Sequence, residues 1–399
     1  MPWQLSLSDI PVRSWDVVVI GAGPAGSVAA FQLARKGHRV LVVDMARFPR
    51  EKVCGDCMIT DVAGILRRMG LYDMIRAVGS VLDGITIFSP GGVNFTIDGD
   101  FVTLKRRQLD TIMVRAAVES GAAFGYGHID NLKVESDGSV LLFVRGSTAG
   151  LKARYVVVAT GSHIGLARRI GGVVSNKPSA IAMRCYVKSK VKINHLLLCY
   201  ERHLLPGYGW IVPLGNDEYN LGCGYFLNNN KHVDLNKCFE SFTTTFPAAK
   251  KIMSDSKIVS PSRSAALRCD LQNARPIINK RVLMVGEVIG ATFPLTGEGI
   301  GQAMTCGELA AGAIDRALST GDNTALEEYK ARVDSELKPR HEGYEYAQKW
   351  ASRKWLNDFV AWRVKRSPFL LQVCTEFITH SDNPRRLYSV SALLKSFWR

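Results

Sequence analysis

Two cysteines separated by two residues, Cys54 and Cys57, are the first candidates for chemistry in this sequence. A zinc site would need a second Cys or His pair at a similar spacing, and the sequence contains none. The two thiols could form a redox pair, Cys54 alone could act at an active site, or both could be small, partly buried apolar side chains. We rank the single active-site cysteine first, the apolar interpretation second, the redox pair third and zinc last.

A glycine-rich turn, Gly21-x-Gly23-x-x-Gly26, follows a β-branched run at 16–20 and precedes a helical stretch. The first glycine permits a tight turn, the second lets the backbone approach a pyrophosphate, and the third lets helix and strand pack closely. The helix N-terminus offers unpaired N–H groups to the phosphates. A second strand at 40–43 ends at Asp44, where an acceptor for a ribose hydroxyl is expected. The sequence therefore predicts a dinucleotide site, rather than an unliganded βαβ unit, at Gly21, Ala22, Gly23, Pro24, Ala25, Gly26, Asp44 and Met45.

Later segments are predicted to return to the same edge of the sheet. The strand at 154–159 runs into Thr160-Gly161, and a strand from Arg281 runs into Gly286-Glu287. Glycines at 297, 299 and 301 then lead into a helix that extends to about Ser319, which creates a second helix N-terminus suited to an anion or dipole. A two-part flavin site requires such a return. An amphipathic helix at 105–120 begins with Lys105, Arg106 and Arg107. Cations are unfavourable at the positive end of the helix dipole, so this start predicts an anionic neighbour.

Short alternating runs predict a separate antiparallel sheet that covers the cofactor: a hairpin at 83–102 and strands at 180–187, 196–201, 209–213 and 219–226. Tyr208 and Trp210 are two residues apart and face the same side of their strand. Facing the core they would be ordinary packing residues, and facing the cofactor they would form an aromatic wall for an apolar substrate. Spacing alone favours the core.

The composition limits the classes of function. With 399 residues, 47% of them hydrophobic, the chain can bury a large core and form two subdomains. A net charge of +15 favours nucleic acid, an anionic membrane or an anionic substrate. We expect no nucleic-acid partner, because the sequence has no run of five basic residues and no RNA-binding signature. We expect a cytoplasmic protein without a disulfide framework, because the first fifteen residues lack an apolar signal core and the nine cysteines are scattered.

The order of these pieces over residues 15–320 resembles the flavoprotein group that includes flavin monooxygenases, flavin halogenases and geranylgeranyl reductases, and is most similar to the geranylgeranyl reductase family. Residues 48–56, Phe-Pro-Arg-Glu-Lys-Val-Cys-Gly-Asp, resemble that family's loop with its active-site cysteine. The run at 208–213 is similar to its substrate-sheet motif, with Val212 where phenylalanine is usual. Residues 294–301 resemble its isoalloxazine-contacting loop, and Arg106 and Leu109 match an R-x-x-L helix whose arginine approaches FAD.

The resemblance implies FAD as the cofactor and a set of site residues. The implied catalytic segment is Cys54, Gly55 and Asp56, and the implied substrate contacts are Tyr208, Trp210 and Pro213. Further implied FAD contacts are Arg106, Gly161, Gly286, Glu287, Pro294, Gly297, Gly299 and Ile300. No metal is implied. Halogenases of the group carry Gly-Glu-Ser at the position of residues 54–56 and two tryptophans where this chain has one, which favours a reductase.

Two departures from the group's pattern concern the flavin. The group has Gly-Asp where this chain has Gly286-Glu287, so the contact with the ribityl chain is altered. The group has Asp-Gly where this chain has Thr160-Gly161. That aspartate helps to hold flavin and nicotinamide cofactor in monooxygenases, so its absence argues against NADPH as the direct reductant and leaves the electron donor open.

The implied activity is saturation of C=C bonds in a geranylgeranyl-type isoprenoid lipid by hydride transfer from reduced flavin. An isolated alkene is a poor hydride acceptor, so the enzyme must align it and supply a proton. Cys54 could supply that proton, relay it or only shape the pocket, and a neutral thiol suits the donor. The alternatives are a flavin monooxygenase or halogenase acting on an aromatic or lipid substrate, a dithiol oxidoreductase using both cysteines, and a flavin-binding protein without turnover.

The C-terminal segment has a basic and aromatic pattern. Trp355, Phe359 and Trp362 lie at i, i+4 and i+7, and six basic residues surround them: Lys349, Arg353, Lys354, Arg363, Lys365 and Arg366. Such a helix can lie on an anionic membrane surface, which would make the protein peripheral to the membrane, or it can dock on the body of the protein. The two interpretations carry equal weight.

The predicted fold is α/β with three parts. A discontinuous Rossmann-type FAD-binding domain comprises 1–82, 103–175 and 265–325. An inserted antiparallel-sheet substrate domain comprises 83–102 and 176–264, and a C-terminal helical region comprises 326–399.

Overall fold

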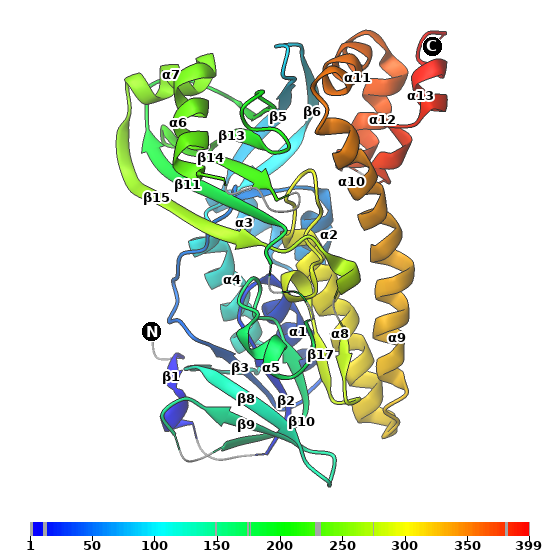
Figure 1. The fold of residues 1–399 in the computed structure, drawn as a ribbon. Helices are drawn as coiled ribbons and strands as arrows, with labels where there is room; N and C mark the ends of the chain where they lie inside the picture. The colour runs from blue at the N-terminus through cyan, green and yellow to red at the C-terminus, as the bar shows by residue number, and fades with distance from the viewer. Residues whose placement is uncertain are drawn as a thin grey trace.

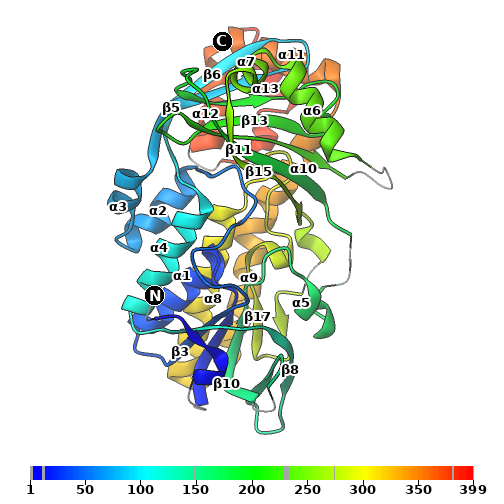
Figure 2. The same ribbon diagram turned by 90° about the vertical axis from the view of Figure 1, so that its left-hand side faces the viewer.

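Two β-sheets lie at opposite ends of the molecule, and a row of helices runs along one side of both (Figures 1 and 2). The computed structural model describes residues 3–10, 14–147, 150–173, 175, 177–227, 233–273, 275–379 and 382–398. The α/β class, the parallel sheet, the antiparallel sheet and the helical C-terminal region are all confirmed.

Sheet A contains the glycine-rich βαβ unit. Its strands lie in the order β1-β7-β3-β2-β10-β17-β16, and the five central neighbours from β7 to β17 are parallel. The hairpin of β8 and β9 extends antiparallel from β10. The bounds are β1 Leu5–Ser6, β2 Ser14–Ile20, β3 Val40–Asp44, β7 Ala123–Tyr126, β8 Ile129–Val134, β9 Val140–Val144, β10 Gly150–Val158, β16 Ile277–Ile278 and β17 Val282–Met284.

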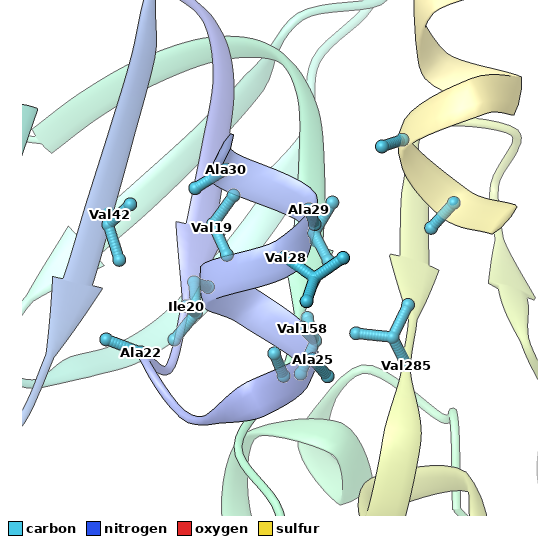
Figure 3. Close-up of a cluster of buried hydrophobic side chains, with 14 of the residues drawn as sticks. Val19, Ile20, Ala22, Ala25, Val28, Ala29, Ala30, Val42, Val158 and Val285 are labelled. Carbon is cyan, nitrogen blue, oxygen red and sulfur yellow. The ribbon is translucent and has the colours of Figure 1, made fainter. Parts of the chain in front are cut away.

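Small side chains hold the first helix against this sheet. Helix α1 (Pro24–Arg35) packs between α4 (Arg106–Glu119) and α8 (Ile300–Thr320). A Cβ at Gly307 of α8 would lie 2.3 Å from the Ala25 carbonyl oxygen, so the two helices touch backbone to backbone. Figure 3 shows the buried cluster that results, in which alanines of α1 face valines of the strands: Val19, Ile20, Ala22, Ala25, Val28, Ala29, Ala30, Val42, Val158 and Val285.

Sheet B has the order β15-β11-β14-β13-β12-β5-β6-β4. All its pairs are antiparallel except β5 with β12, where a parallel pairing joins the early hairpin to the later strands. The exposed edge strand β15 shows no alternation of buried and exposed residues, and it was not predicted from the sequence. The bounds are β4 Cys57–Met58, β5 Ser80–Phe88, β6 Asn94–Thr103, β11 Ala180–Lys188, β12 His195–Cys199, β13 Tyr208–Pro213, β14 Glu218–Phe226 and β15 Lys257–Leu267.

The C-terminal helices pack on sheet B and share a core with it. Helix α9 continues through a π-helical turn at Val333–Leu337 into α10, which carries the chain from the side of sheet A to that of sheet B (Figure 1). The other bounds are α2 Thr60–Arg68, α3 Tyr72–Val78, α5 Gly165–Arg169, α6 Leu235–Thr245, α7 Pro247–Ser254, α9 Ala325–Arg332, α10 Lys338–Ala351, α11 Lys354–Arg366, α12 Pro368–Thr379 and α13 Val390–Lys395. Within the described residues, no helix combines the length and apolarity needed to cross a membrane.

Candidate active site

One cavity of about 960 Å³ lies between the two sheets. Its floor is formed by the β2–α1 turn and the carboxyl ends of β3, β10 and β17, as expected where parallel strands end at one edge. Its roof is formed by sheet B, and α10 and α12 close one side. The cavity therefore joins a glycine-lined part to an apolar part, whose walls include Ile85, Leu196, Leu198, Tyr344, Phe377 and Ile378.

The glycine turn is packed too tightly for side chains. Gly21 has φ +103°, and a Cβ there would lie 2.3 Å from the Ala159 carbonyl oxygen. A Cβ at Gly26 would lie 1.8 Å from the Gly21 carbonyl oxygen. Gly23 precedes α1 and faces two guanidinium groups, because a Cβ there would lie 3.6 Å from Arg50 Nη2 and 4.0 Å from Arg106 Nη2. The turn thus presents backbone N–H groups and two positive charges to a bound anion.

Buried carboxylates hold these two arginines. Asp110 accepts two hydrogen bonds from Arg106, at 2.6 and 2.8 Å, and lies 3.1 Å from Arg50 Nη1. Asp44 accepts the Ala22 N–H at 2.9 Å and lies 3.5 Å from Arg50 Nε. Our sequence analysis missed Arg50 and Asp110. The i, i+4 spacing of Arg106 and Asp110 on one helix was an available signal for the second.

Asp56 fixes the cysteine loop to helix α4 and to sheet B. It is fully buried with φ 62°, its Oδ1 accepts the Arg106 N–H at 3.0 Å, and its Oδ2 accepts Tyr186 Oη–H at 2.7 Å. Asn220 Nδ2 donates to the same Oδ2 at 2.8 Å and to the Cys54 carbonyl oxygen at 2.7 Å. Burial raises the pKa of Asp56, and the hydrogen bonds from Tyr186, Arg106 and Asn220 oppose that rise. We interpret Asp56 as a positioning residue.

Both cysteines of the loop line the cavity and hold neutral thiols. Burial raises the pKa of Cys54, although the Arg106 guanidinium opposes the effect, and burial raises the pKa of Cys57 to about 12. A redox dithiol needs a thiolate as the attacking group, so this environment disfavours it. A neutral thiol can hold a proton at the junction of the two parts of the cavity.

The two aromatic residues of β13 lie on the cavity wall and also within the core of sheet B. Tyr208 Oη donates to the Thr296 carbonyl oxygen, and Trp210 Nε1 donates to Asn220 Oδ1 at 2.9 Å. Their ring centroids are 6.1 Å apart. The core packing is confirmed, and the position of both rings on the cavity wall is compatible with the cofactor-facing interpretation.

Most of the residues predicted for the site line this cavity, and a few lie behind it. The lining residues are Gly21, Gly23, Pro24, Ala25, Asp44, Met45, Cys54, Gly55, Asp56, Arg106, Gly161, Tyr208, Trp210, Glu287, Gly297, Gly299 and Ile300. Five lie outside the lining: Ala22, Gly26, Pro213, Gly286 and Pro294. Pro213 contributes its carbonyl oxygen to Thr103 at 2.7 Å, and Gly286 lies between Ala25 and Ala303.

The two departures from the flavoprotein pattern lie side by side. Glu287 Oε2 is 3.4 Å from the position of a Cβ on Gly161 and 3.4 Å from Lys52 Nζ. Lys52 Nζ also donates to Ser162 at 3.2 Å. The buried Thr160 hydroxyl has no hydrogen-bond partner within the described structure. Glu287 therefore places its carboxylate next to Thr160-Gly161, where other members of the group have Asp-Gly.

Comparison with curated proteins gives relatives over most of the chain. Conditioned medium factor receptor 1 of Dictyostelium discoideum is 31% identical over 80% of this chain and 66% of that longer protein. A menaquinone reductase of Mycobacterium tuberculosis is 32% identical over 76% of this chain and 77% of the relative. A digeranylgeranylglycerophospholipid reductase of Methanopyrus kandleri is 27% identical over 81% of this chain and 83% of the relative.

Solved structures share the fold. A geranylgeranyl bacteriochlorophyll reductase-like protein of Thermoplasma acidophilum has a TM-score of 0.77 at 19% identity and covers 96% of both chains. The flavin-dependent brominase Bmp2 has the same TM-score, at 19% identity over 96% of this chain and 98% of its own. Fold similarity thus does not separate a reductase from a halogenase. The model of the FAD binding domain family matches residues 14–335. The chain therefore belongs to that family, and it is an FAD-dependent oxidoreductase of the group to which its sequence motifs pointed.

Proposed function

We propose that this protein reduces C=C bonds of an isoprenoid lipid of the geranylgeranyl type. The observation that carries the proposal is the buried, neutral Cys54 thiol in the cavity wall, which interacts with the Arg106 guanidinium beside the glycine turn and electrostatically with Tyr208 of sheet B. The names of two relatives support it, because menaquinone and a digeranylgeranyl lipid are both isoprenoid lipids. We also propose that sheet A, sheet B and the C-terminal helices correspond to the three predicted domains.

The site residues fit FAD, and each has a role in this reaction. Arg50, Arg106 and the N-terminus of α1 would bind the pyrophosphate, and Asp44 would accept a ribose hydroxyl. FAD supplies the hydride when it is reduced. Loop 294–299, whose Thr296 carbonyl oxygen accepts a hydrogen bond from Tyr208 of sheet B, would hold the part of FAD that faces the alkene.

The protein's own residues align the substrate, exclude water from the reacting bond and supply a proton. The apolar walls bind the prenyl chain, and burying it excludes water from the reacting bond. Trp210, fixed by Asn220, orients the chain against the cofactor part of the cavity. Cys54 carries the proton to the alkene carbon that does not accept the hydride.

The test is an anaerobic reoxidation experiment on the photoreduced holoenzyme. We expect a geranylgeranyl glycerolipid or geranylgeranyl diphosphate to reoxidise the flavin without oxygen and to gain two hydrogens per step by mass spectrometry. We expect Cys54→Ala to slow that reoxidation about 10²-fold, the effect of losing a positioned acid. A flavin that is reoxidised only by air would refute the proposal and favour the monooxygenase or halogenase alternative.

Cys57→Ala is the matched control, since it removes the neighbouring thiol from the same loop. We expect it to retain reoxidation within a few-fold of the wild-type rate. Equal losses in the two variants would instead favour the redox-pair interpretation.

We further propose that the C-terminal helices bind an anionic membrane surface. Helix α11 is docked on sheet B through Val360 and Val364, yet its Trp355 remains 68% exposed. Trp398, beyond α13, is 89% exposed. Both helices lie at the end of the molecule farthest from sheet A (Figures 1 and 2). Exposed basic residues accompany them: Arg353, Lys354, Lys365, Arg366 and Lys395. Exposed indoles beside cations are typical of membrane-surface helices.

We expect the double substitution Trp355→Ala and Trp398→Ala to weaken binding to anionic vesicles at least tenfold, because two indoles lose their burial in the interface. Co-sedimentation with phosphatidylglycerol vesicles measures this, and the fold should be unaffected because both side chains are exposed. Phe143→Ala, an exposed aromatic on β9 of sheet A, is the control and should bind as wild type. Equal binding by all three proteins would contradict the proposal.

A further inference from the structure

Glu298 is a carboxyl group in the cavity wall that no role described so far uses. It lies in the loop between Phe293 and helix α8, and it is one of the residues that line the cavity. Its Oε1 is buried and has no hydrogen-bond partner within the described structure. Buried polar atoms of folded proteins are nearly always hydrogen-bonded, so an unpartnered carboxyl oxygen in a cavity wall requires a functional explanation.

The charges around Glu298 favour its neutral form. Arg340, on α10, directs Nη2 to Asp61 Oδ2 at 3.1 Å, and Gln302 donates to the same oxygen at 3.2 Å. The nearby cation is thus already paired with Asp61, on α2. An ionised Glu298 would add a second negative charge to this group with no cation of its own. Burial and the Asp61 charge together raise the pKa of Glu298 to about 8, although Arg340 opposes them.

The remaining groups that face Glu298 are weak acids that line the same cavity. They are Cys57 on β4, Tyr208 on β13 and Tyr344 on α10, and a charge on Glu298 raises the pKa of each. Tyr208 and Tyr344 border the apolar part of the cavity, whereas Cys57 interacts electrostatically with both Cys54 and Glu298. Glu298 therefore interacts electrostatically with Tyr208 and Tyr344 of the apolar part and with Cys57 of the cysteine pair.

We propose that Glu298 is the proton source of the reaction, a neutral carboxylic acid that reprotonates Cys54 after each reduction. The inference rests on the proposed function. In each cycle the Cys54 S–H bond breaks and its proton forms the new C–H bond on the carbon that does not accept the hydride. The O–H bond of Glu298 then breaks, its proton returns to the Cys54 sulfur, and its electron pair stays on the carboxylate. Water reprotonates the carboxylate when product leaves, so each cycle consumes one hydride and one proton.

The first test concerns the carboxylic acid itself and needs neither substrate nor turnover. We expect the infrared spectrum of the holoenzyme to contain a protonated-carboxyl C=O band at pH 6 that is lost by pH 10. The band should be absent from Glu298→Gln and unchanged in Glu308→Gln, which alters a half-buried acid of α8 that is paired with Arg68. A band that persists in Glu298→Gln would overturn the proposal.

Thermal stability gives a second readout. Because the folded-state pKa lies above the ordinary 4.5, folding takes up a proton between pH 4.5 and about 8, and this contribution to stability falls as the pH rises through that window. Glu298→Gln is neutral at every pH and lacks the effect. We therefore expect the Tm of the wild type, relative to that of Glu298→Gln, to fall from pH 5 to pH 9, and a constant difference would count against the proposal.

The third test is the pH profile of lipid-dependent reoxidation in repeated turnovers. We expect the wild-type rate to fall above about pH 8, and Glu298→Gln to be at least tenfold slower at pH 7 and to lack that limb. A limb that persists in Glu298→Gln would refute the assignment. If the wild type shows the infrared band but no lipid reoxidises its flavin at any pH, the proposed function is refuted, although Glu298 would still be shown to be a neutral acid.

Discussion

Replacing Gly26 with alanine is expected to abolish FAD binding and to lower the free energy of unfolding by about 3 kcal/mol or more. The added Cβ would lie 1.8 Å from the Gly21 carbonyl oxygen and 3.1 Å from Val19 Cγ1. Neither neighbour is the flexible end of a side chain, so α1 must move away from β2. That movement displaces Gly23 and the N-terminus of α1, which face the pyrophosphate site. Flavin absorbance after gel filtration and urea unfolding would measure the two effects.

The control is Gly312→Ala in helix α8, where an added Cβ meets no atom within 4 Å. There the same chemical change should stabilise the protein by about 0.5–1 kcal/mol, because glycine costs that much in a helix interior. If Gly26→Ala purified with stoichiometric FAD and wild-type stability, the close packing of the turn would be refuted.

Asp56→Ala is expected to lower the free energy of unfolding by about 3–5 kcal/mol and to reduce turnover at least 10²-fold. The substitution leaves the Tyr186 hydroxyl, the Asn220 amide and the Arg106 N–H without their acceptor inside the protein. It also places alanine at φ 62°, a left-handed conformation that costs a further ~1–2 kcal/mol. Cys54 then loses its fixed position, because Asn220 is the residue that holds its carbonyl oxygen.

Two variants separate this network from a general effect of losing an aspartate. Asp56→Asn keeps an oxygen for the Arg106 N–H and tolerates φ 62°, so we expect a loss smaller than that of Asp56→Ala. Asp137→Ala removes an exposed aspartate paired with Lys152 and should change the free energy of unfolding far less, because solvent screens exposed ion pairs. Urea unfolding and the lipid-dependent rate measure all three. A cost for Asp56→Ala no larger than that for Asp137→Ala would contradict the role of Asp56.

The secondary-structure elements next to the glycine turn and the Arg106 helix could be predicted from the sequence alone. The strands predicted at 16–20 and 40–43 are β2 and β3, and the helix predicted at 105–120 is α4. FAD as the cofactor was also correctly predicted. The strands and the helix depend on residues within about thirty positions of one another, where strand runs, glycine spacing and helical periodicity are visible in the sequence. The prediction of FAD came instead from the resemblance over residues 15–320.

The contacts that surround the reactive groups could not be predicted from the sequence, because they join distant parts of the chain. Asp56 meets Tyr186 and Asn220, 130 and 164 positions later in the chain, and Trp210 faces both core and cavity. The parallel pairing of β5 with β12 brings distant segments together. The pKa of Glu298 is raised because burial between the packed elements and the Asp61 charge on α2 outweigh the opposing charge of Arg340 on α10. Such contacts have no period and no fixed spacing, because they arise where two sheets and their helices are packed together, and burial and neighbouring charge then set the protonation of each group.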